Sequence, residues 1–350
     1  MTSQTSIGIV GDQFEHFPGT RFMGSKNKIV YKIWDILRHY KFNSFLDAFA
    51  GSNVIGYFMK CQGKRVVTND FMTFSYLIST AIIENSSVCV SDDELMFLLH
   101  NENDNDFIYE TFRGLYFSDV DNRVLDRVRF NLSQLECEYK QALGISALVR
   151  ACLKKRPRGI FTYTGQKYDD GRKDIKCSIT EHFIESLSLF NNAVFDNGTN
   201  CKAENKQTFE LDSCADMVYI DPPYYTPNSD NDYVRRYHFV EGLAKNWQGL
   251  DIQNETMTKK FKSYNSPFSS KASAYIAFDE LIKKYKESIV VVSYSSNSLP
   301  TKNEMLEILS RYKNQVKFYE FDHTYSFGNQ NHKIGNKFNH VKEYLFIGDD

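Results

Sequence analysis

The residues with the clearest chemical potential are four consecutive side chains, Asp221, Pro222, Pro223 and Tyr224, called the tetrad below. They directly follow the short apolar run MVYI, which predicts a buried strand. Two prolines end such a strand and fix a stiff turn at its carboxyl end, the edge of an open α/β sheet where ligands bind. The tetrad therefore predicts a carboxylate, a backbone carbonyl and an aromatic ring held together at a ligand site.

This combination suits methyl transfer to an aromatic amine, whose nitrogen is a poor nucleophile because its lone pair is delocalised into the ring. If Asp221 accepted one N–H hydrogen and the carbonyl of Pro222 the other, the nitrogen would be held in line with a methyl donor. The same acceptors would stabilise its developing positive charge. Tyr224 would stack on the base, which is worth about 1–3 kcal/mol. The alternative is a structural Pro-Pro turn in which Asp221 is only a cap.

A second group of residues is typical of a nucleotide-like cofactor site. The segment DAFAGS, residues 47–52, follows an apolar run, and Gly51 allows a tight turn close to a ligand. Asp70 ends the next predicted strand, 23 positions after Asp47 (70 − 47), where a carboxylate can accept hydrogen bonds from ribose hydroxyls. The pattern alone does not separate S-adenosylmethionine from a nicotinamide dinucleotide. The complete G-x-G-x-x-G motif is absent, which disfavours a dehydrogenase.

The third candidate is the segment FMGSK, residues 22–26, which precedes a predicted helix. Lys26 lies near the start of that helix, where its ammonium group would pair with a ligand carboxylate. Residues 19–26 also read G-x-x-x-x-G-S-K, close to the phosphate-binding loop G-x-x-x-x-G-K-S/T. Because the last two residues are transposed and no buried strand precedes the segment, we disfavour a nucleotide triphosphatase.

Hydrophobic periodicity predicts the elements that position these segments. The first part of the chain reads as the start of a doubly wound sheet. Its predicted elements are a helix with Ser25 as its cap, a strand ending at Asp47, a helix over 53–61, a strand over 64–70 and a helix over 73–84.

The rest of the chain divides into a helical middle and a second α/β part. Residues 85–199 show mostly helical patterns, and strands reappear from 216 onward. The final two predicted strands, 315–321 and 340–348, are expected to pair antiparallel at the sheet edge. We therefore predict an α/β protein with a Rossmann-like doubly wound sheet, formed by residues 1–84 and 200–350, and an inserted, mostly helical subdomain over 85–199.

Composition and charge restrict the class of protein. The chain has 350 residues and a net charge of −2, so any nucleic-acid surface must be local. No apolar run approaches the ~18 residues of a membrane span, and the N-terminal residues lack the pattern of a secretory signal. The seven cysteines contain no C-x-x-C pair and the eight histidines form no spaced ligand set. We therefore expect a cytoplasmic protein with no disulfides and no structural metal.

Basic residues are concentrated at two places. The block over 154–174 mixes lysine and arginine with aromatic residues and glycines, which is typical of a loop that contacts phosphates and base edges in a groove. A solvated charged loop is the alternative. The second cluster follows the tetrad, where it would grip phosphates beside a reacting base. The predicted DNA-binding residues are Lys154, Lys155, Arg156, Arg158, Arg172, Arg235 and Arg236.

The three segments, in this order, resemble the DNA adenine methylase family, the alpha-arranged N6-adenine-specific DNA methyltransferases of restriction–modification systems. The similarity covers about 19–84 and 205–348. It implies the fold of the S-adenosylmethionine-dependent methyltransferases, with the tetrad as the catalytic segment and the middle subdomain as the part that recognises the target. The cofactor-binding residues that it implies are Phe22, Lys26, Asp47, Phe49, Gly51, Asp70, Asn205 and Asp221.

Two positions depart from the family pattern. Asn53 stands where the cofactor loop usually carries a second glycine, which leaves the backbone path after Ser52 open. Asn205 stands where an aspartate is expected, so an amide replaces a carboxylate there.

The residues and the resemblance together predict transfer of a methyl group from S-adenosyl-L-methionine to N6 of adenine in double-stranded DNA. A stacked adenine cannot reach a cleft in the protein, so the base must flip out. No cysteine is suitably placed as a nucleophile, so we expect direct in-line transfer. The predicted context is a type II restriction–modification system, with a monomeric enzyme and a cognate restriction endonuclease encoded nearby.

Other substrates and one other class of protein stay open. Adenine in RNA and the amino group of cytosine are chemically equivalent targets for the tetrad. A protein-glutamine methyltransferase would usually carry Asn in place of Asp221. A non-catalytic cofactor-binding module that recognises DNA would be expected to have lost Asp221 or Asp70, and both are present.

Overall fold

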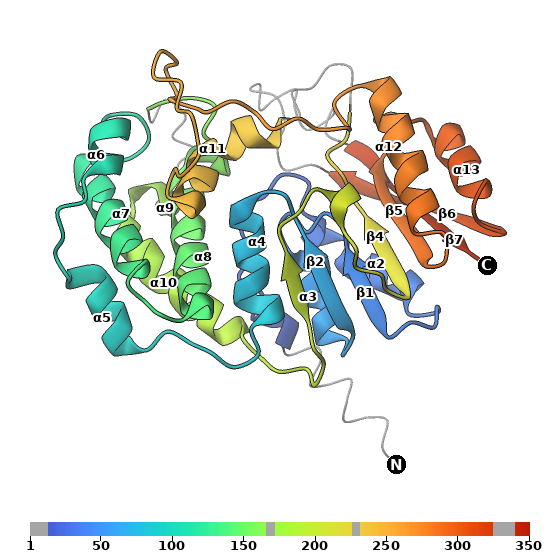
Figure 1. Cartoon of the computed structure of the whole chain (residues 1–350), viewed down its shortest axis with the longest axis horizontal. Coiled ribbons are helices and arrows are strands. Elements are labelled where there is room, and N and C mark those ends of the chain that lie inside the picture. The colour runs from blue at the N-terminus through green and yellow to red at the C-terminus, as the bar shows by residue number, and fades with distance from the viewer. Residues whose placement is uncertain (1–12, 166–171, 226–231, 325–339) are drawn as a thin grey trace.

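A mixed seven-stranded sheet organises the molecule (Figure 1). The computed structural model describes residues 13–165, 172–225, 232–324 and 340–350. The strands are β1 (Ser44–Asp47), β2 (Arg65–Asn69), β3 (Lys202–Glu204), β4 (Met217–Ile220), β5 (Ile289–Ser295), β6 (Gln315–Thr324) and β7 (His340–Asp349). Their order is β3-β2-β1-β4-β5-β7-β6.

Strand direction confirms the predicted Rossmann-like fold. The pairs among β1 to β5 are parallel, whereas β7 is antiparallel to both β5 and β6. The closing antiparallel pair at the edge is therefore confirmed. The chain moves outward from β1 to β2 and β3, then returns to β4 on the other side of β1. In such a sheet, ligands bind at this reversal point, beyond the carboxyl ends of the strands.

The central strands are buried on both faces because their side chains alternate between two apolar cores. Met217 and Tyr219 of β4 belong to one core, and Val218 and Ile220 belong to the other. This double burial explains why the sequence shows continuous apolar runs rather than alternation.

Helices cover the sheet where the sequence predicted them, with local differences. The predicted helix 73–84 is an α-helix that continues as a π-helical turn. Ser25 does not cap the first helix: its side chain accepts a hydrogen bond from Ser52 at 3.1 Å, and a short 3-10 turn comes first. The helices packed near the sheet are η1 (Lys26–Lys28), α2 (Val30–Leu37), α3 (Val54–Cys61), α4 (Thr73–Ser79), η2 (Thr80–Glu84), η4 (Thr208–Glu210), α11 (Tyr233–Lys245), α12 (Lys271–Lys284) and α13 (Lys302–Ser310).

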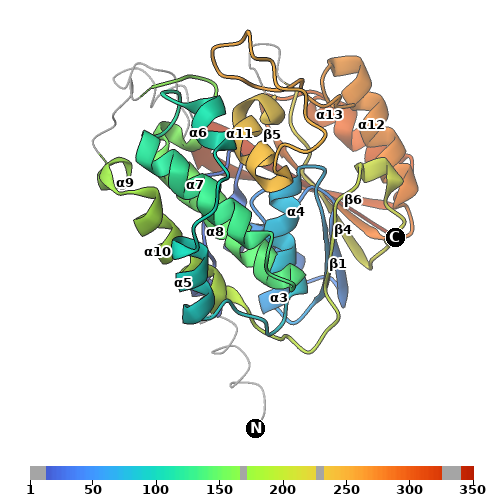
Figure 2. The same cartoon turned by 60° about the vertical axis from the view of Figure 1, so that its left-hand side comes forward.

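The middle of the chain forms a group of helices at one end of the sheet (Figures 1 and 2). Its elements are α5 (Asp92–His100), α6 (Phe107–Phe112), α7 (Asp119–Leu132), α8 (Glu138–Lys155), η3 (Pro157–Gly159), α9 (Lys173–Lys176) and α10 (Ile179–Ala193). The central helix is α8, which is buried over residues 142–153 and packs on α4, α10 and α11. One apolar core joins these helices to the sheet, so the boundary 85–199 stays a prediction.

None of the helices in the described part of the chain is both long and apolar enough to cross a membrane.

Candidate active site

A pocket lies where β1, β2 and β4 end. All three predicted segments line it: residues 22–26, residues 47–52 except Ala48, and the tetrad. Every predicted catalytic residue lines this pocket, as does every predicted cofactor residue except Asn205. The tertiary structure therefore brings together residues that are almost 200 positions apart in the sequence.

The loop after β1 is tied to both neighbouring strands. The backbone N–H of Ala48 donates to the carbonyl of Tyr219 on β4 at 3.0 Å, and that of Ala50 donates to Asn69 on β2 at 2.9 Å. Gly51 has a φ of +50°, and a Cβ there would lie 3.0 Å from the ring of Phe22. This close approach of loop and ring explains the glycine.

Asn53 resolves the first departure from the family pattern. Its φ of 64° and ψ of 9° lie in the left-handed region, which asparagine tolerates better than most other non-glycine residues. The Asn53 side-chain amide donates to the carbonyl of Ser75 at 3.0 Å, and its oxygen accepts a hydrogen bond from Ser79. Asn53 therefore adopts a left-handed conformation of the kind that favours glycine, and its side chain anchors the loop to α4.

Asp70 connects the loop after β1 with the start of α4. One carboxylate oxygen accepts the N–H of Gly51 at 2.8 Å, and the other accepts the N–H of Met72 at 2.9 Å. Burial raises the pKa of Asp70 to about 6, although these two backbone hydrogen bonds oppose the shift. Each oxygen retains a further lone pair, so the carboxylate can still accept hydrogen bonds from a ligand.

Asn205 lies behind Asp70 instead of lining the pocket. Its side-chain amide donates to the backbone carbonyl of Asp70 at 2.7 Å. This hydrogen bond fixes the backbone that presents the Asp70 carboxylate. In this arrangement Asn205 supports the part of the pocket wall that Asp70 forms. Its direct contact with a cofactor stays a prediction.

Asp221 is held at the centre of the pocket by a cation and a hydroxyl group. Lys26 Nζ lies 2.9 Å from Asp221 Oδ1 and 2.8 Å from Oδ2, and the Tyr224 hydroxyl donates to Oδ1 at 2.5 Å. Burial raises the pKa of Asp221; Lys26 opposes this shift and the nearby carboxylate of Glu343 adds to it. Because 16% of the Asp221 side-chain surface stays exposed, the carboxylate remains accessible from the pocket.

Asp47 adds a second acidic group beside Asp221. Its side chain is only 1% exposed, and burial, followed by the charge of Asp221, raises its pKa to about 8. The carboxyl group of Asp47 is therefore largely protonated at neutral pH. A neutral Asp47 avoids placing a second uncompensated negative charge next to Asp221.

Phe22 positions the segment that carries Lys26. Its ring stacks on Tyr237 of α11, with centroids 5.1 Å apart and planes 4° apart. The hydroxyl of Tyr237 accepts the backbone N–H of Met23 at 2.8 Å, and that of Tyr233 donates to the carbonyl of the same residue at 3.2 Å. The helix α11, which follows the tetrad, thus holds the segment over residues 22–26 in place.

Comparison with known proteins decides which family this site represents. Residues 22–298, which include all three segments, match the family described as D12 class N6 adenine-specific DNA methyltransferase. The chain belongs to this family. The predicted enzyme class, adenine-specific transfer of a methyl group to DNA, is thereby confirmed at the level of the family, which requires a methyl donor and a DNA substrate.

Several type II modification enzymes are similar to this methyltransferase. Type II methyltransferase M2.HphI of Haemophilus parahaemolyticus is 29% identical over 95% of this chain and 97% of its own length. Type II methyltransferase M.NlaIII of Neisseria lactamica is 24% identical over 87% of this chain and 90% of its own length. Modification methylase StsI of Streptococcus sanguinis is 27% identical over 83% of this chain, a match that spans only 46% of that protein.

Two buried glutamates of the methyltransferase were missed by sequence reasoning. Glu343 of β7 lies 3.2 Å from Lys26 Nζ and accepts the Tyr224 hydroxyl at 3.0 Å. Glu241 of α11 accepts the first backbone N–H groups of α4, from Thr73 at 3.0 Å and Phe74 at 3.1 Å. One feature of the sequence could have indicated both residues: each is a glutamate in an otherwise largely apolar run, KEYLFIG for Glu343 and HFVEGLA for Glu241.

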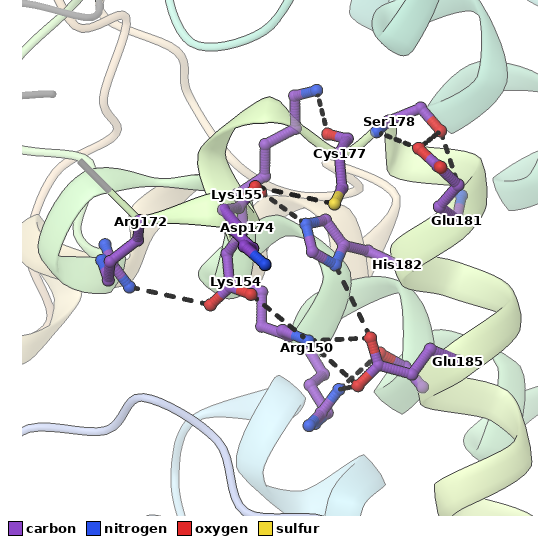
Figure 3. Close-up of polar contacts among 12 residues, drawn as sticks. Arg150, Lys154, Lys155, Arg172, Asp174, Cys177, Ser178, Glu181, His182 and Glu185 are labelled. Atoms are coloured by element: carbon purple, nitrogen blue, oxygen red, sulfur yellow. Dashed lines mark hydrogen bonds and ion pairs between the residues drawn. The ribbon is translucent and has the colours of Figure 1, made fainter. Parts of the chain in front are cut away.

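The predicted DNA-binding lysines of the methyltransferase form polar contacts within the helical segment, and Figure 3 shows those of Lys154 with Glu185 and of Lys155 with the carbonyl of Cys177. Both belong to the last turn of α8 rather than to a loop. Lys154 lies 2.8 Å from Glu185 of α10, whereas Lys155 lies 3.0 Å from Asp121 of α7. These contacts tie neighbouring helices together, so a role in DNA binding would require the lysines to exchange these partners.

Arg156 has a different place from the one predicted. Its side chain is only 1% exposed. The guanidinium group donates to four backbone carbonyls, those of Tyr116, Ile160, Tyr163 and Gly165, at 2.7–3.4 Å. Arg156 therefore stabilises the loop from inside. If its side chain turned to a phosphate, these carbonyls would lose their hydrogen-bond donor.

The remaining predicted arginines lie nearer the surface. Arg235 is exposed and Arg236 is half-buried, both in the first turns of α11, directly after the tetrad region. Arg158 and Arg172, both in the basic block over 154–174, are half-buried. Residues 166–171 of this block lie outside the described residues. A hydrogen bond from Phe161 N–H to the Arg236 carbonyl, at 2.9 Å, joins the two basic regions. Their contact with DNA stays a prediction.

Proposed function

We propose that the pocket binds S-adenosyl-L-methionine and that the tetrad holds the N6 amino group of an adenine flipped out of double-stranded DNA. When bound, this cofactor supplies an electrophilic methyl group. The proposal rests on one observation above all: the carboxylate of Asp221 lies in the wall of the same pocket as the nucleotide-type loop after β1.

The residues of the pocket fit such a cofactor. Asp70 has lone pairs left for ribose hydroxyls, and Gly51 lets the backbone approach closely. Phe22 and Phe49 offer aromatic faces to an adenine ring. Lys26 lines the same cavity, but it would have to exchange Asp221 or Glu343 for the carboxylate of a cofactor. Anionic, cationic and aromatic groups thus line one cavity, as the mixed chemistry of an amino-acid nucleoside requires.

In the proposed mechanism, Asp221 accepts one N–H hydrogen of the adenine amine and the carbonyl of Pro222 accepts the other. This arrangement orients the nitrogen lone pair and stabilises the positive charge that develops on the nitrogen. The methylated nitrogen is acidic, so it loses a proton readily to Asp221. No cysteine lines the pocket among the described residues, which agrees with direct transfer without a covalent enzyme–DNA intermediate.

We further propose that the helical segment recognises the DNA target. Arg235 and Arg236 would contact phosphates beside the flipped base, and Arg158 and Arg172 would contact the groove. We assign Lys154 and Lys155 a secondary role, because their ion pairs would have to open first. Arg156 is left out of this surface because it is buried.

The cellular context is also a proposal. The type II relatives suggest a modification enzyme that protects DNA from a cognate restriction endonuclease encoded nearby. We expect the enzyme to act as a monomer in the bacterial cytoplasm, where the DNA is.

The test is transfer of a labelled methyl group from S-adenosylmethionine to unmethylated DNA, followed by nucleoside analysis. Label in N6-methyldeoxyadenosine is the expected result, and mapping the modified sites would give the recognition sequence. Label in RNA only would move the substrate to RNA. No label in either would refute the proposed cofactor and mechanism.

A further inference from the structure

Glu343 is a buried carboxylate that lies behind the catalytic tetrad. It belongs to β7 and its exposed fraction is 1%. A single oxygen, Oε1, accepts a hydrogen bond from the Ser293 hydroxyl at 2.9 Å, and it lies 3.2 Å from Lys26 Nζ. The same oxygen lies 3.0 Å from the Tyr224 hydroxyl, whose one proton can go either to it or to Asp221 Oδ1 at 2.5 Å. A buried carboxylate costs free energy unless such partners compensate for it, so its position calls for a physical explanation.

The donors that contact Glu343 are also the donors that contact Asp221. Lys26 contacts both oxygens of Asp221, and the Tyr224 hydroxyl donates to one of them. A carboxylate has about four lone-pair positions, and these donors use most of them. An N–H hydrogen of the substrate amine would compete with Lys26 and Tyr224 for the same two oxygens of Asp221. Glu343 offers both of them another acceptor within 3.2 Å.

We propose that Glu343 is a positioning residue for methyl transfer. It accepts the hydrogen bonds of Lys26 and Tyr224 when Asp221 turns to the amine, and so keeps the Asp221 carboxylate available. This inference rests on the proposed role of Asp221. Glu343 itself acts through Lys26 and Tyr224 and has no contact with the substrate in this scheme.

The charge of Glu343 also affects the acidity of Asp221. The negative charge of Glu343 raises the pKa of Asp221, whereas Lys26 lowers it. Without Glu343, Lys26 would pair with Asp221 more tightly and the pKa of Asp221 would fall. The other titratable groups around this pair in the described structure are Asp47 of β1, Asp70 after β2, Tyr219 of β4, Tyr224 of the tetrad and Tyr294 of β5.

The experiment compares the full-length wild-type enzyme with Glu343→Gln, which removes the charge but keeps the shape. The rate of methyl transfer in a single turnover, with saturating DNA and S-adenosylmethionine, should fall by about 10- to 100-fold. The affinity for DNA should stay close to that of the wild type. Because transfer needs ionised Asp221 and its pKa is lower in the variant, the acid limb of the rate–pH profile should move to lower pH.

Two further variants make the result specific. Glu343→Asp keeps the charge on a shorter side chain, so the rate should fall while the acid limb stays near its wild-type position. This variant tests the inference even if Glu343→Gln does not fold. Glu320→Gln is the matched control: Glu320 lies on β6, the strand beside β7, and forms an exposed ion pair with Lys342 at 2.5 Å. Its rate and pH profile should equal those of the wild type.

The outcomes separate this inference from the proposed function. An active wild type with an equally active Glu343→Gln would overturn the inference and leave the function intact. A slower Glu343→Gln with an unmoved acid limb would also overturn it, because a purely structural role would have that effect. A wild type that transfers no methyl group would refute the proposed function, and the inference with it.

Discussion

Asp221 meets a cation, a hydroxyl group and two other carboxyl groups within one small pocket. Burial and Glu343 raise its pKa, and Lys26 restrains the rise. Burial therefore makes Asp221 more basic and a stronger hydrogen-bond acceptor, while Lys26 favours its ionised form. Such tuning is common at catalytic sites, where an acceptor must match its task.

At this scale the first prediction concerns Asp221→Ala. The variant should lose at least about 100-fold in the rate of methyl transfer, because the acceptor for the amine and for its developing charge is gone. DNA binding in a gel-shift assay should stay close to wild type, since Asp221 lies inside the pocket. Full activity of this variant would refute the assignment of the site.

Asp47→Asn tests the buried carboxyl group of the cofactor loop. The pKa of Asp47 is about 8 in the folded protein, above the ordinary value of 3.8. Between these values the folded state binds more protons than the unfolded state, so this group's stabilisation is present at low pH and is lost as pH rises towards 8. Asparagine mimics the neutral carboxyl group without titrating.

The measurement is urea unfolding at pH 5 and pH 8. The loss of unfolding free energy between these pH values should be smaller in Asp47→Asn than in the wild type. Asp35→Asn, at an exposed position with 68% of the side chain accessible, serves as the control and should follow the wild type. An unchanged pH dependence in Asp47→Asn would contradict the buried, protonated state of Asp47.

Among the elements, α11 has a central role because it touches both the pocket and the helical segment. Its residue Tyr237 stacks on Phe22, and its residue Glu241 caps α4. Through Glu241, α11 therefore also fixes the start of α4, the helix that follows Asp70. Displacement of α11 would therefore disturb both sides of the pocket.

Glu241→Gln tests this link. An amide has only one acceptor oxygen, so one of the two backbone N–H groups of α4 loses its partner, at a cost of about 1 kcal/mol. Because α4 begins three positions after Asp70, binding of S-adenosylmethionine in calorimetry should also weaken. Glu304→Gln is the matched control, since Glu304 caps α13 away from the pocket. Its amide oxygen can still accept the Thr301 N–H, so the affinity for the cofactor should not change.

Arg156→Ala tests the internal brace of the basic loop. The change removes a donor from buried carbonyls, which costs about 1–3 kcal/mol for each carbonyl left unsatisfied. The melting temperature should therefore fall by several degrees. Arg113→Ala, at a position that is 60% exposed, should have little effect. Equal stability of the two variants would show that the carbonyls find other partners.

In the whole molecule, the helical segment lies at one end of the sheet (Figures 1 and 2), where α8 packs on α4 and α11. Since α11 also holds the segment over 22–26 that lines the pocket, it connects the pocket with the helical segment. Basic residues on α11 and in the loop after α8 meet through the Phe161–Arg236 hydrogen bond. A net charge of −2 means that attraction to DNA depends on this local surface.

Arg235→Ala tests the proposed DNA surface. Removing one phosphate contact should weaken DNA binding similarly for all sequences and reduce the slope of log affinity against log salt by about 1. The affinity for S-adenosylmethionine should not change. Arg38→Ala, an exposed arginine just beyond α2 at the opposite edge of the sheet, is the control and should bind DNA like the wild type. An unchanged salt slope in Arg235→Ala would exclude this contact.

The amino-acid sequence alone predicted every strand except the short β3, several helices of the sheet and the three segments that line the pocket. These features depend on local patterns, because an apolar run followed by Asp221 and two prolines defines a strand end without knowledge of the rest of the chain. The order of the segments also indicated the family, which the comparisons confirmed.

Only the tertiary structure revealed the partners of these residues. Glu343 lies 119 positions after Tyr224, and it reaches the tetrad because β7 inserts antiparallel beside β5. The sequence suggests that Arg156 is a surface cation, but its side chain is buried and donates to the backbone carbonyls of Tyr116 and Tyr163. Local periodicity reports which face of an element is buried. Which polar side chains meet there depends on strand order and register, which no local pattern contains.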